Sequence, residues 1–261
     1  MNLNPNKLRQ HVLKMVYEKS SGHIGGSFSM AEIVAYIYSN YDVASDKIGS
    51  SRFILSKGHG VPIVYSALYE LGLISDADMN LFREVDSPLQ GHPDKVRMGY
   101  MHATTGSLGQ GLSIAIGHAL AMKQRGLDKK CFCILGDGEM QEGQVWEALM
   151  LAPKYKLDNL ICIVDHNKSQ NDGLVEDILS LKPLDEKIKS FNWEVHEMDG
   201  NNKNEVSSVI SKVSSDLNGM PKFIIANTQK GFGVSFMNDP AWHAKAPNKS
   251  EFEMAMKELK C

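Results

Sequence analysis

Residues 131–136 read Cys-Phe-Cys-Ile-Leu-Gly, and residues 160–165 read Leu-Ile-Cys-Ile-Val-Asp. Each is a short apolar run, which is typical of a strand buried on both faces. A helical pattern over residues 144–155 separates them, and the strand-like runs at 193–197 and 222–227 flank another helical pattern at 203–217. Strands that alternate with helices predict an α/β fold in three layers, a mostly parallel sheet with helices on both faces.

Further elements surround this pattern. Two helix starts carry capping residues: Ser29 and Glu32 have the spacing of a capping box, and Ser75 can cap the helix after it. The other expected elements are helices over residues 7–19, 60–73, 75–85 and 108–124, a strand over 52–56 and a loop over 88–100. Without a repeat or a flexible linker, we expect one domain over residues 1–261, with its ligand at the carboxyl ends of the strands.

The composition limits the classes of function. The chain has 261 residues, of which 43% are hydrophobic and 23% charged, and this is ordinary for a globular protein. Its net charge of −3 argues against nucleic acid or a membrane surface as partner, because both usually need a basic excess.

The cysteines and the apolar runs predict that the protein is located in the cytoplasm. No apolar run is long enough to span a bilayer, and the polar start of the chain lacks the core of a signal peptide. Cys131, Cys133 and Cys162 lie inside apolar runs and are expected in the core, while Cys261 is terminal. None has the spacing of zinc ligands, so a reducing compartment fits them.

Gly136-Asp137-Gly138 follows the first buried strand directly. Glycines let a ligand approach the backbone closely, and a helix that begins here would direct N–H groups and the positive end of its dipole at an anion. A carboxylate repels a phosphate unless a divalent cation lies between them, so Asp137 favours a metal-bridged phosphate. The alternative is a tight turn in which Asp137 only caps the helix.

Polar residues also follow the next buried strand. His166-Asn167-Lys168-Ser169 comes directly after it, and Asn167 lies 30 residues after Asp137, which is one strand–helix–strand unit. Adjacent parallel strands bring their carboxyl ends together. The Asp137 carboxylate, the Asn167 amide oxygen and a nearby carbonyl form a set of hard oxygen ligands, which predicts Mg²⁺, with Ca²⁺ or Mn²⁺ as alternatives.

Gly-Asp-Gly followed by Asn at this spacing is the thiamine diphosphate motif, and further motifs in the same order resemble the transketolase family. They are Ser21-Gly22-His23-Ile24-Gly25-Gly26, Ser56-Lys57-Gly58-His59-Gly60, Gly91-His92-Pro93, Thr104-Thr105-Gly106-Ser107-Leu108-Gly109-Gln110-Gly111 and Trp242-His243-Ala244-Lys245-Ala246-Pro247. The resemblance covers nearly the whole chain and implies a thiamine diphosphate-binding fold. A complete transketolase also has a pyrimidine-binding domain and a C-terminal domain, and this chain ends before either. It therefore resembles the N-terminal subunit of a split transketolase, whose partner chain carries both.

The resemblance implies which residues bind the cofactor. Asp137, Asn167 and the carbonyl of Ser169 would hold the metal. The diphosphate would contact the Gly138 N–H together with His59 and His243. Gly106 and Leu108 would lie against the aminopyrimidine.

It also implies which residues meet the substrate and the partner. Glu142 would couple to the partner's glutamate that activates the pyrimidine, and His23, His92 and His243 would face the substrate hydroxyls. Neutral imidazoles can donate to and accept from such hydroxyls near pH 7. Like His59, His23 and His92 lie beside Gly or Pro in loops, and His243 lies in a loop motif that contains Pro247. We expect packed or surface roles for His11, His102, His118 and His196.

The implied reaction is the reversible transfer of a two-carbon ketol group from a ketose to an aldose, both phosphorylated or otherwise modified. We expect activity only with the partner subunit, in an α₂β₂ heterotetramer. Two alternatives stay open: another thiamine diphosphate reaction, such as deoxyxylulose phosphate formation or 2-oxoacid decarboxylation, and a non-catalytic regulatory paralogue. Ile24, Ala244 and Asn171 depart from the family pattern, and their effect on the substrate stays open.

Overall fold

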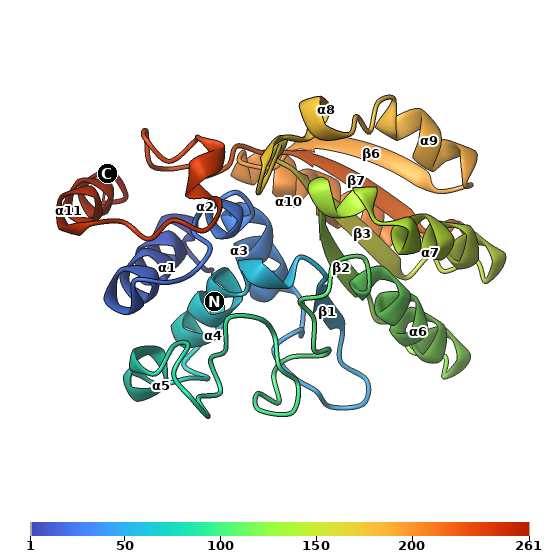
Figure 1. Cartoon of the computed structure of the whole chain (residues 1–261). Helices are drawn as coiled ribbons and strands as arrows, with labels where there is room; N and C mark the ends of the chain where they lie inside the picture. Colours follow the sequence, from blue (N-terminus) through green and yellow to red (C-terminus); the bar gives the residue numbers. More distant parts are fainter. Residues whose placement is uncertain (1, 261) are drawn as a thin grey trace.

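A five-stranded parallel sheet forms the centre of the computed structural model, which describes residues 2–260. Its strands are β1 (Arg52–Leu55), β2 (Cys131–Gly136), β3 (Leu160–His166), β6 (Glu194–Asp199) and β7 (Lys222–Asn227). They lie in the order β1-β2-β3-β7-β6, and every neighbouring pair is parallel (Figure 1). The predicted α/β fold is confirmed.

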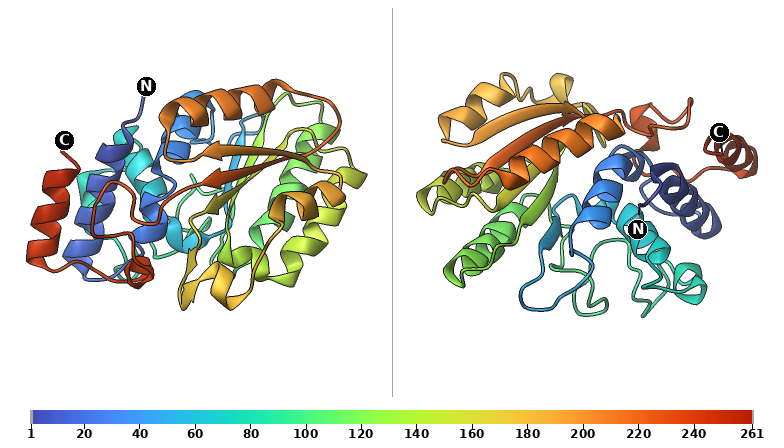
Figure 2. Two further views of the ribbon diagram at one scale, coloured as in Figure 1. Left: turned by 90° about the horizontal axis from the view of Figure 1, so that it is seen from above. Right: turned by 180° about the vertical axis from the view of Figure 1, so that it is seen from behind.

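Helices cover both faces of this sheet, because β1, β2, β3 and β7 bury side chains in both directions. On one face Cys131, Cys133 and Leu135 of β2 share a core with residues of α6 (Gly111–Gln124), α7 (Gly143–Lys154) and α9 (Leu184–Ser190). On the other face Phe132 and Ile134 share a core with residues of α1 (Pro5–Lys19), α3 (Ala31–Asn40), α4 (Pro62–Glu70) and α10 (Lys203–Ser215). The view from behind in Figure 2 shows α3 and α10 on that side.

Shorter elements complete the described chain. They are the helices α2 (Gly25–Phe28), α5 (Asp76–Asn80), α8 (Val175–Ile178) and α11 (Lys249–Glu258), the 3₁₀ helices η1 (Gly58–Gly60), η2 (Gly138–Gln141) and η3 (Pro240–His243), and the strands β4 (Ser169–Gln170) and β5 (Gly173–Leu174), which form a hairpin. Helix α11 packs on α1, and the Gln10 Nε2 donates to the Leu259 carbonyl at 2.9 Å. The two ends of the chain therefore lie on the same side of the molecule (Figure 2).

The register of the strands brings the polar motifs together. Gly136 of β2 pairs with Asp165 of β3, and Asp165 pairs with Ala226 of β7. The segments that begin at Asp137, at Asn167 and after β7 therefore leave the sheet side by side at its carboxyl edge, as predicted for the first two.

The predicted capping box of Ser29 and Glu32 is wrong. Helix α3 begins at Ala31, and its N-cap Met30 makes no side-chain capping bond. The Ser29 hydroxyl instead donates to Asp165 Oδ2 at 2.6 Å, and Glu32 forms a buried ion pair with Arg9. Leaving a buried charge unpaired costs more free energy than leaving a helix end uncapped. Ser29 and Glu32 therefore contact buried charged groups instead of capping α3.

Two other predicted helix boundaries also differ. Ser75 caps α5 as predicted, through a capping box with Asp78, but α5 ends at Asn80 rather than near residue 85. The segment after Asp137 is the 3₁₀ helix η2, and the α-helix begins only at Gly143. The helix predicted over residues 144–155 is therefore confirmed within one residue, but a 3₁₀ turn stands where a helix N-terminus was expected directly after Asp137.

Two further findings concern burial. Within residues 2–260, no helix is both long and apolar enough to cross a membrane. Cys131, Cys133 and Cys162 are fully buried and unpaired, which confirms their predicted place in the core, while Cys261 lies outside the described residues.

Candidate functional site

A cavity of about 250 Å³ lies at the carboxyl edge of the sheet, between the segments that follow β1, β2, β3 and β7. It is lined by the predicted site residues His59, Leu108, Asp137, Gly138, Glu142, Asn167, Ser169 and His243. Ligands of α/β proteins bind at this edge because the loops there can diverge around them. This cavity lies at the edge where the sequence predicts the ligand, and of the predicted site residues His23, His92 and Gly106 are not part of its lining.

Asp137 is buried at the floor of this cavity. Its Oδ1 accepts from the Gly138 N–H at 2.8 Å, so it caps the 3₁₀ turn as the alternative interpretation expected, and its Oδ2 accepts from the Lys168 N–H. Burial, together with the charge of Asp165, raises the pKa of Asp137 to about 6. A divalent cation beside this carboxylate would relieve the cost of its buried charge.

The neighbouring residues supply further oxygen atoms. The Asn167 Oδ1 accepts from the Ser169 N–H at 3.2 Å, and an amide oxygen has a second lone pair for a ligand. The Ser169 Oγ and the Gln170 Oε1 are buried without a hydrogen-bond partner among the described residues. Such orphaned polar atoms in a cavity fit a polar ligand that satisfies them.

The donor set determines which cation fits. Among residues 2–260, no three His, Cys, Asp or Glu side chains lie close enough together to hold a metal ion. A cation at Asp137 would therefore depend on amide, carbonyl and phosphate oxygens, which is the ligand chemistry of Mg²⁺. A Cβ on Gly138 would come within 2.8 Å of the Gln170 side chain, so this position admits only glycine without rearrangement.

Two buried lysines line the same cavity, and sequence reasoning missed both. Lys57 is 1% exposed and forms an ion pair with Asp165, while Lys230 is 2% exposed with its Nζ 3.3 Å from His243 Nδ1. Burial, with the nearby charge of Lys57, lowers the pKa of Lys230 to about 8. Lys57 belongs to the motif Ser56-Lys57-Gly58-His59-Gly60. Lys230 follows β7 in a segment that contains no motif, so its position after a strand was the only sign that it lies at the site.

Four histidines form one cluster, which reaches the cavity through His59 and His243. The ring centroid of His23 lies 5.1 Å from that of His59, 5.4 Å from that of His243 and 6.3 Å from that of His92. Each reaches this point from a different loop or short helix, so residues far apart in the sequence form one cluster. A Cβ on Gly106 would meet the His92 ring at 3.1 Å, which places Gly106 against the cluster.

The environment keeps these rings neutral. Burial, then the charge of Arg83, lowers the pKa of His23 to about 4, and burial with Lys230 lowers that of His243 to about 3. The pKa values of His59 and His92 are lowered chiefly by burial too. The His23 Nδ1 is buried without a hydrogen-bond partner among the described residues, which fits a site whose polar atoms are satisfied by a ligand.

The two glutamates of the Gly-Asp-Gly segment differ in environment. Glu139 is buried and accepts from Ser56 Oγ and from the N–H groups of Gly109 and Gly136, so it holds three segments together. Glu142 is exposed at the rim of the cavity and makes no capping bond to α7. An exposed carboxylate at the rim fits the predicted coupling to a partner.

The other histidines lie elsewhere. His11 Nε2 is 2.6 Å from Glu70 Oε1, His196 Nε2 is 2.7 Å from Glu194 Oε1, and buried His102 contacts the backbone of Phe53. None of these, and not His118 on α6, lines the cavity. The expectation of packed or surface roles agrees with these contacts.

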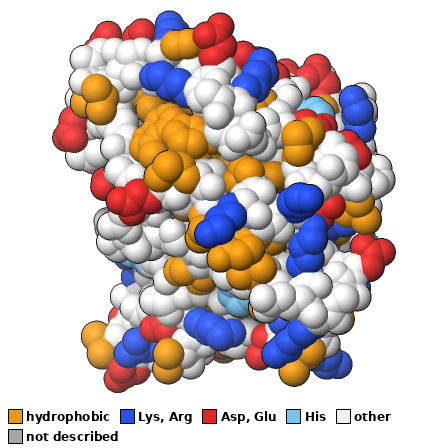
Figure 3. All heavy atoms as spheres, turned by 90° about the vertical axis from the view of Figure 1, so that its right-hand side faces the viewer, with side chains coloured by type: hydrophobic (Ala, Val, Ile, Leu, Met, Phe, Trp, Pro, Cys, Tyr) orange, Lys and Arg blue, Asp and Glu red, His pale blue; other side chains and the backbone are white. Residues whose placement is uncertain are grey.

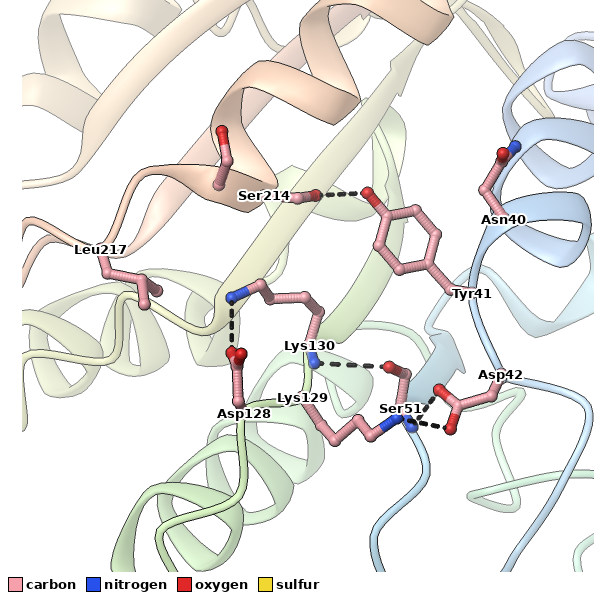
Figure 4. Close-up of a pocket in the computed structure, with 10 residues that line it drawn as sticks. Asn40, Tyr41, Asp42, Ser51, Asp128, Lys129, Lys130, Ser214 and Leu217 are labelled. Carbon is pink, nitrogen blue, oxygen red and sulfur yellow. Dashed lines mark hydrogen bonds and ion pairs between the residues drawn. The ribbon is translucent and has the colours of Figure 1, made fainter.

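A second hollow, of about 490 Å³, lies at the opposite edge of the sheet (Figure 4). Its residues precede β1 and β2, or lie in the last turns of α3 and α10 and directly after these helices. Lys129 pairs with Asp42 at 2.9 Å and Lys130 with Asp128 at 3.7 Å, so both lysine charges are already matched. It contains none of the predicted site residues, and we place the functional site at the carboxyl edge.

Comparison with known proteins identifies the family of this chain. The family model for the thiamine diphosphate binding domain of transketolase matches residues 2–260. The chain is 42% identical over 259 residues to one of the subunits of apulose-4-phosphate transketolase from Actinobacillus succinogenes, covering 97% of this chain and 92% of that protein. It is 38% identical over 235 residues to a 6-deoxy-6-sulfo-D-fructose transketolase subunit from a Clostridium species, covering 88% of this chain and 85% of that protein.

Solved structures give the same result. The structure matches transketolase from Leishmania mexicana with a TM-score of 0.92 and 26% identity, over 98% of this chain and 40% of that chain. The chain thus spans less than half of a solved transketolase but nearly all of the subunit from Actinobacillus succinogenes. It belongs to the transketolase family, as the N-terminal component that carries the thiamine diphosphate-binding domain.

Proposed function

We propose that this chain is one diphosphate-binding domain that works with a partner subunit in reversible ketol transfer between a ketose and an aldose. The observation that carries the proposal is the cavity that joins Asp137, Asn167, two buried lysines and the neutral histidines. When bound, thiamine diphosphate supplies the nucleophilic carbon and the electron sink that break the bond between C2 and C3 of the ketose.

The chain's own residues divide into two groups. Asp137, Asn167 and the Ser169 carbonyl hold the divalent cation, which is Mg²⁺ by its donor chemistry, with Ca²⁺ or Mn²⁺ as substitutes. The Gly138 N–H, His59, Lys230 and His243 bind the diphosphate, and Gly106 and Leu108 contact the aminopyrimidine.

In the histidine cluster, His23, His92 and His243 bind the hydroxyls of the sugar and move protons between them. Their lowered pKa values support this role, because neutral rings can both donate and accept near pH 7. The substrates are sugar phosphates or related modified sugars. The relatives named for apulose-4-phosphate and 6-deoxy-6-sulfo-D-fructose support this class of substrate.

The partner subunit carries the pyrimidine-binding and C-terminal domains, and we propose an α₂β₂ heterotetramer with the cofactor at the interface. Glu142 reaches the partner's activating glutamate from the rim of the cavity. Figure 3 shows hydrophobic side chains gathered in patches on the side that carries α6, α7 and α9, where Met150 and Leu151 of α7 and its C-cap Tyr155 are exposed. Exposed apolar patches of this kind support association. The buried, unpaired cysteines support a cytoplasmic location.

The test compares donors in the presence of the partner. We expect turnover with a ketose donor such as xylulose 5-phosphate, apulose 4-phosphate or 6-deoxy-6-sulfofructose, measured by coupled detection of the released carbonyl product. We expect none with pyruvate, measured by the release of CO₂. If pyruvate is the only donor that is turned over, the result would support a decarboxylase or a deoxyxylulose phosphate synthase. Assembly without turnover on any donor would support a regulatory paralogue.

His23→Ala is expected to lower kcat/KM for the ketose about 100-fold, because the variant loses a group that moves protons between sugar hydroxyls. Steady-state kinetics of the assembled enzyme measure this effect. His118→Gln is the control, since His118 lies on α6 and lines neither the cavity nor the histidine cluster, and it should leave kcat/KM unchanged. An unchanged kcat/KM in His23→Ala would remove this ring from the substrate site.

Lys230→Met is expected to raise the Kd of thiamine diphosphate about 10-fold, because a charge-assisted hydrogen bond contributes roughly 1.5–3 kcal/mol. The pKa of Lys230 is lowered to about 8, so its positive charge is lost as the pH rises through this value. Wild-type affinity should therefore fall between about pH 7 and pH 9, and Lys230→Met should lose that dependence. Calorimetric titration measures both effects, with the exposed Lys212→Met as control.

A further inference from the structure

Asp165 is a fully buried carboxylate near the end of β3, and it does not line the cavity. Four side chains nevertheless donate to it. Its Oδ2 accepts from Ser29 Oγ at 2.6 Å, from Asn167 Nδ2 at 2.9 Å and from Lys57 Nζ, and its Oδ1 accepts from Thr228 Oγ1. These donors come from four separate segments, so one carboxylate joins the segments that surround the cavity.

Burying this carboxylate costs free energy of folding, which indicates that it has a role other than stability. A buried ion pair contributes little net stability compared with apolar residues of the same volume. Lys57 balances the charge of Asp165 and also donates to the Gly26 carbonyl at 2.9 Å. The paired carboxylate is therefore ionised, and an ionised carboxylate can only accept hydrogen bonds.

This restriction fixes the amide of Asn167. Its Nδ2 faces Asp165, and its Oδ1 accepts from the Ser169 N–H at 3.2 Å. The reversed amide would place an oxygen against the carboxylate and an NH₂ group against an N–H donor. Both neighbours therefore select the same orientation, in which the oxygen lies on the side away from Asp165.

We propose that Asp165 is a positioning residue for the metal site, because its carboxylate holds the Asn167 amide with its oxygen presented to the cation. The proposal rests on the proposed function, in which Asn167 is a metal ligand. Groups that orient metal ligands in this way typically contribute 10- to 100-fold to metal affinity. A side chain two residues away in sequence and outside the cavity thus determines which atom of Asn167 the cation meets.

The first experiment titrates Mn²⁺ into the full chain assembled with its partner and thiamine diphosphate, and follows free Mn²⁺ by electron paramagnetic resonance. Asp165→Asn is expected to raise the Mn²⁺ Kd about 10- to 100-fold. Thr228→Val is the matched control, because it removes a donor from Oδ1 of the same carboxylate and leaves Oδ2, which faces Asn167. An equal loss in both variants, or no loss in Asp165→Asn, overturns the proposal.

A second variant separates positioning from a merely structural role. Asn167→Asp has an oxygen at both ends of its side chain, so its metal ligand needs no orienting partner. In the Asp165→Asn background it should restore Mn²⁺ binding to within about 3-fold of wild type, a coupling that a double-mutant cycle measures. A structural role for Asp165 predicts no such rescue.

Asp165→Asn leaves Lys57 without its counter-ion, so circular dichroism first establishes that the variant folds. If Asp165→Asn does not fold, the single variant Asn167→Asp tests the proposal instead. Its carboxylate would face that of Asp165, and the proposal then expects weaker Mn²⁺ binding although a carboxylate is the stronger ligand. Undiminished binding overturns the proposal, while wild-type protein that binds no Mn²⁺ overturns the proposed function itself.

Discussion

The chain purified without a partner subunit is expected to show no measurable ketol transfer, at least about 1,000-fold below the assembled enzyme, which is roughly 4 kcal/mol of barrier. The described residues hold the diphosphate end of the proposed site, whereas the groups that activate the pyrimidine and bind the sugar phosphate are expected on the partner. The chain covers 40% of a solved transketolase but 92% of a protein named as a subunit. A coupled assay with the chain, the partner and an equimolar mixture measures the effect.

The partner alone should be inactive as well, and the mixture should saturate at one partner per chain. Glu142→Gln serves as a probe of the contact, because Glu142 is exposed at the rim and its replacement leaves the fold intact. It should lower kcat in the mixture without preventing assembly, which sedimentation can follow. Full turnover by the chain alone would contradict the proposal of a split enzyme.

Asp137→Asn is expected to weaken Mg²⁺-dependent binding of thiamine diphosphate at least about 100-fold. The variant keeps the volume of the side chain but removes the charge that the cation needs. One backbone N–H of Gly138 or Lys168 would lose its acceptor, which costs about 1–3 kcal/mol of stability. Calorimetric titration with and without Mg²⁺ measures the affinity, and thermal unfolding measures the stability separately.

Asp172→Asn is the matched control for this change. Asp172 is a carboxylate at the same cavity, but it is exposed and its Oδ1 accepts only from Asn171 Nδ2 at 3.0 Å. Its replacement should change the Kd of thiamine diphosphate by no more than about 3-fold, because a solvated charge is screened. Tight Mg²⁺-dependent binding by Asp137→Asn would mean that the cation, if present, lies elsewhere.

The strands and the loop residues of the proposed site were predictable from hydrophobic periodicity and from short motifs. The runs that became β2 and β3 have the composition of strands buried on both faces, and their register places Gly136 beside Asp165. Because parallel neighbours share an edge, the sequence alone brought Asp137 and Asn167 to the same cavity. The loop histidines were predictable from the motifs of the family, in which His23, His59 and His92 stand beside Gly or Pro and His243 stands four residues before Pro247.

The charged framework behind the cavity was decided by the tertiary structure. Ser29 has the pattern of a helix cap but donates to Asp165, 136 residues away, and Lys57 and Thr228 meet the same carboxylate from other segments. Local patterns describe a residue's neighbours along the chain, whereas a charge buried in a low dielectric must find its partners in space. The sequence by itself therefore determined the strands, the edge and the ligands of the proposed site, and only the packing of distant segments determined which buried groups orient them.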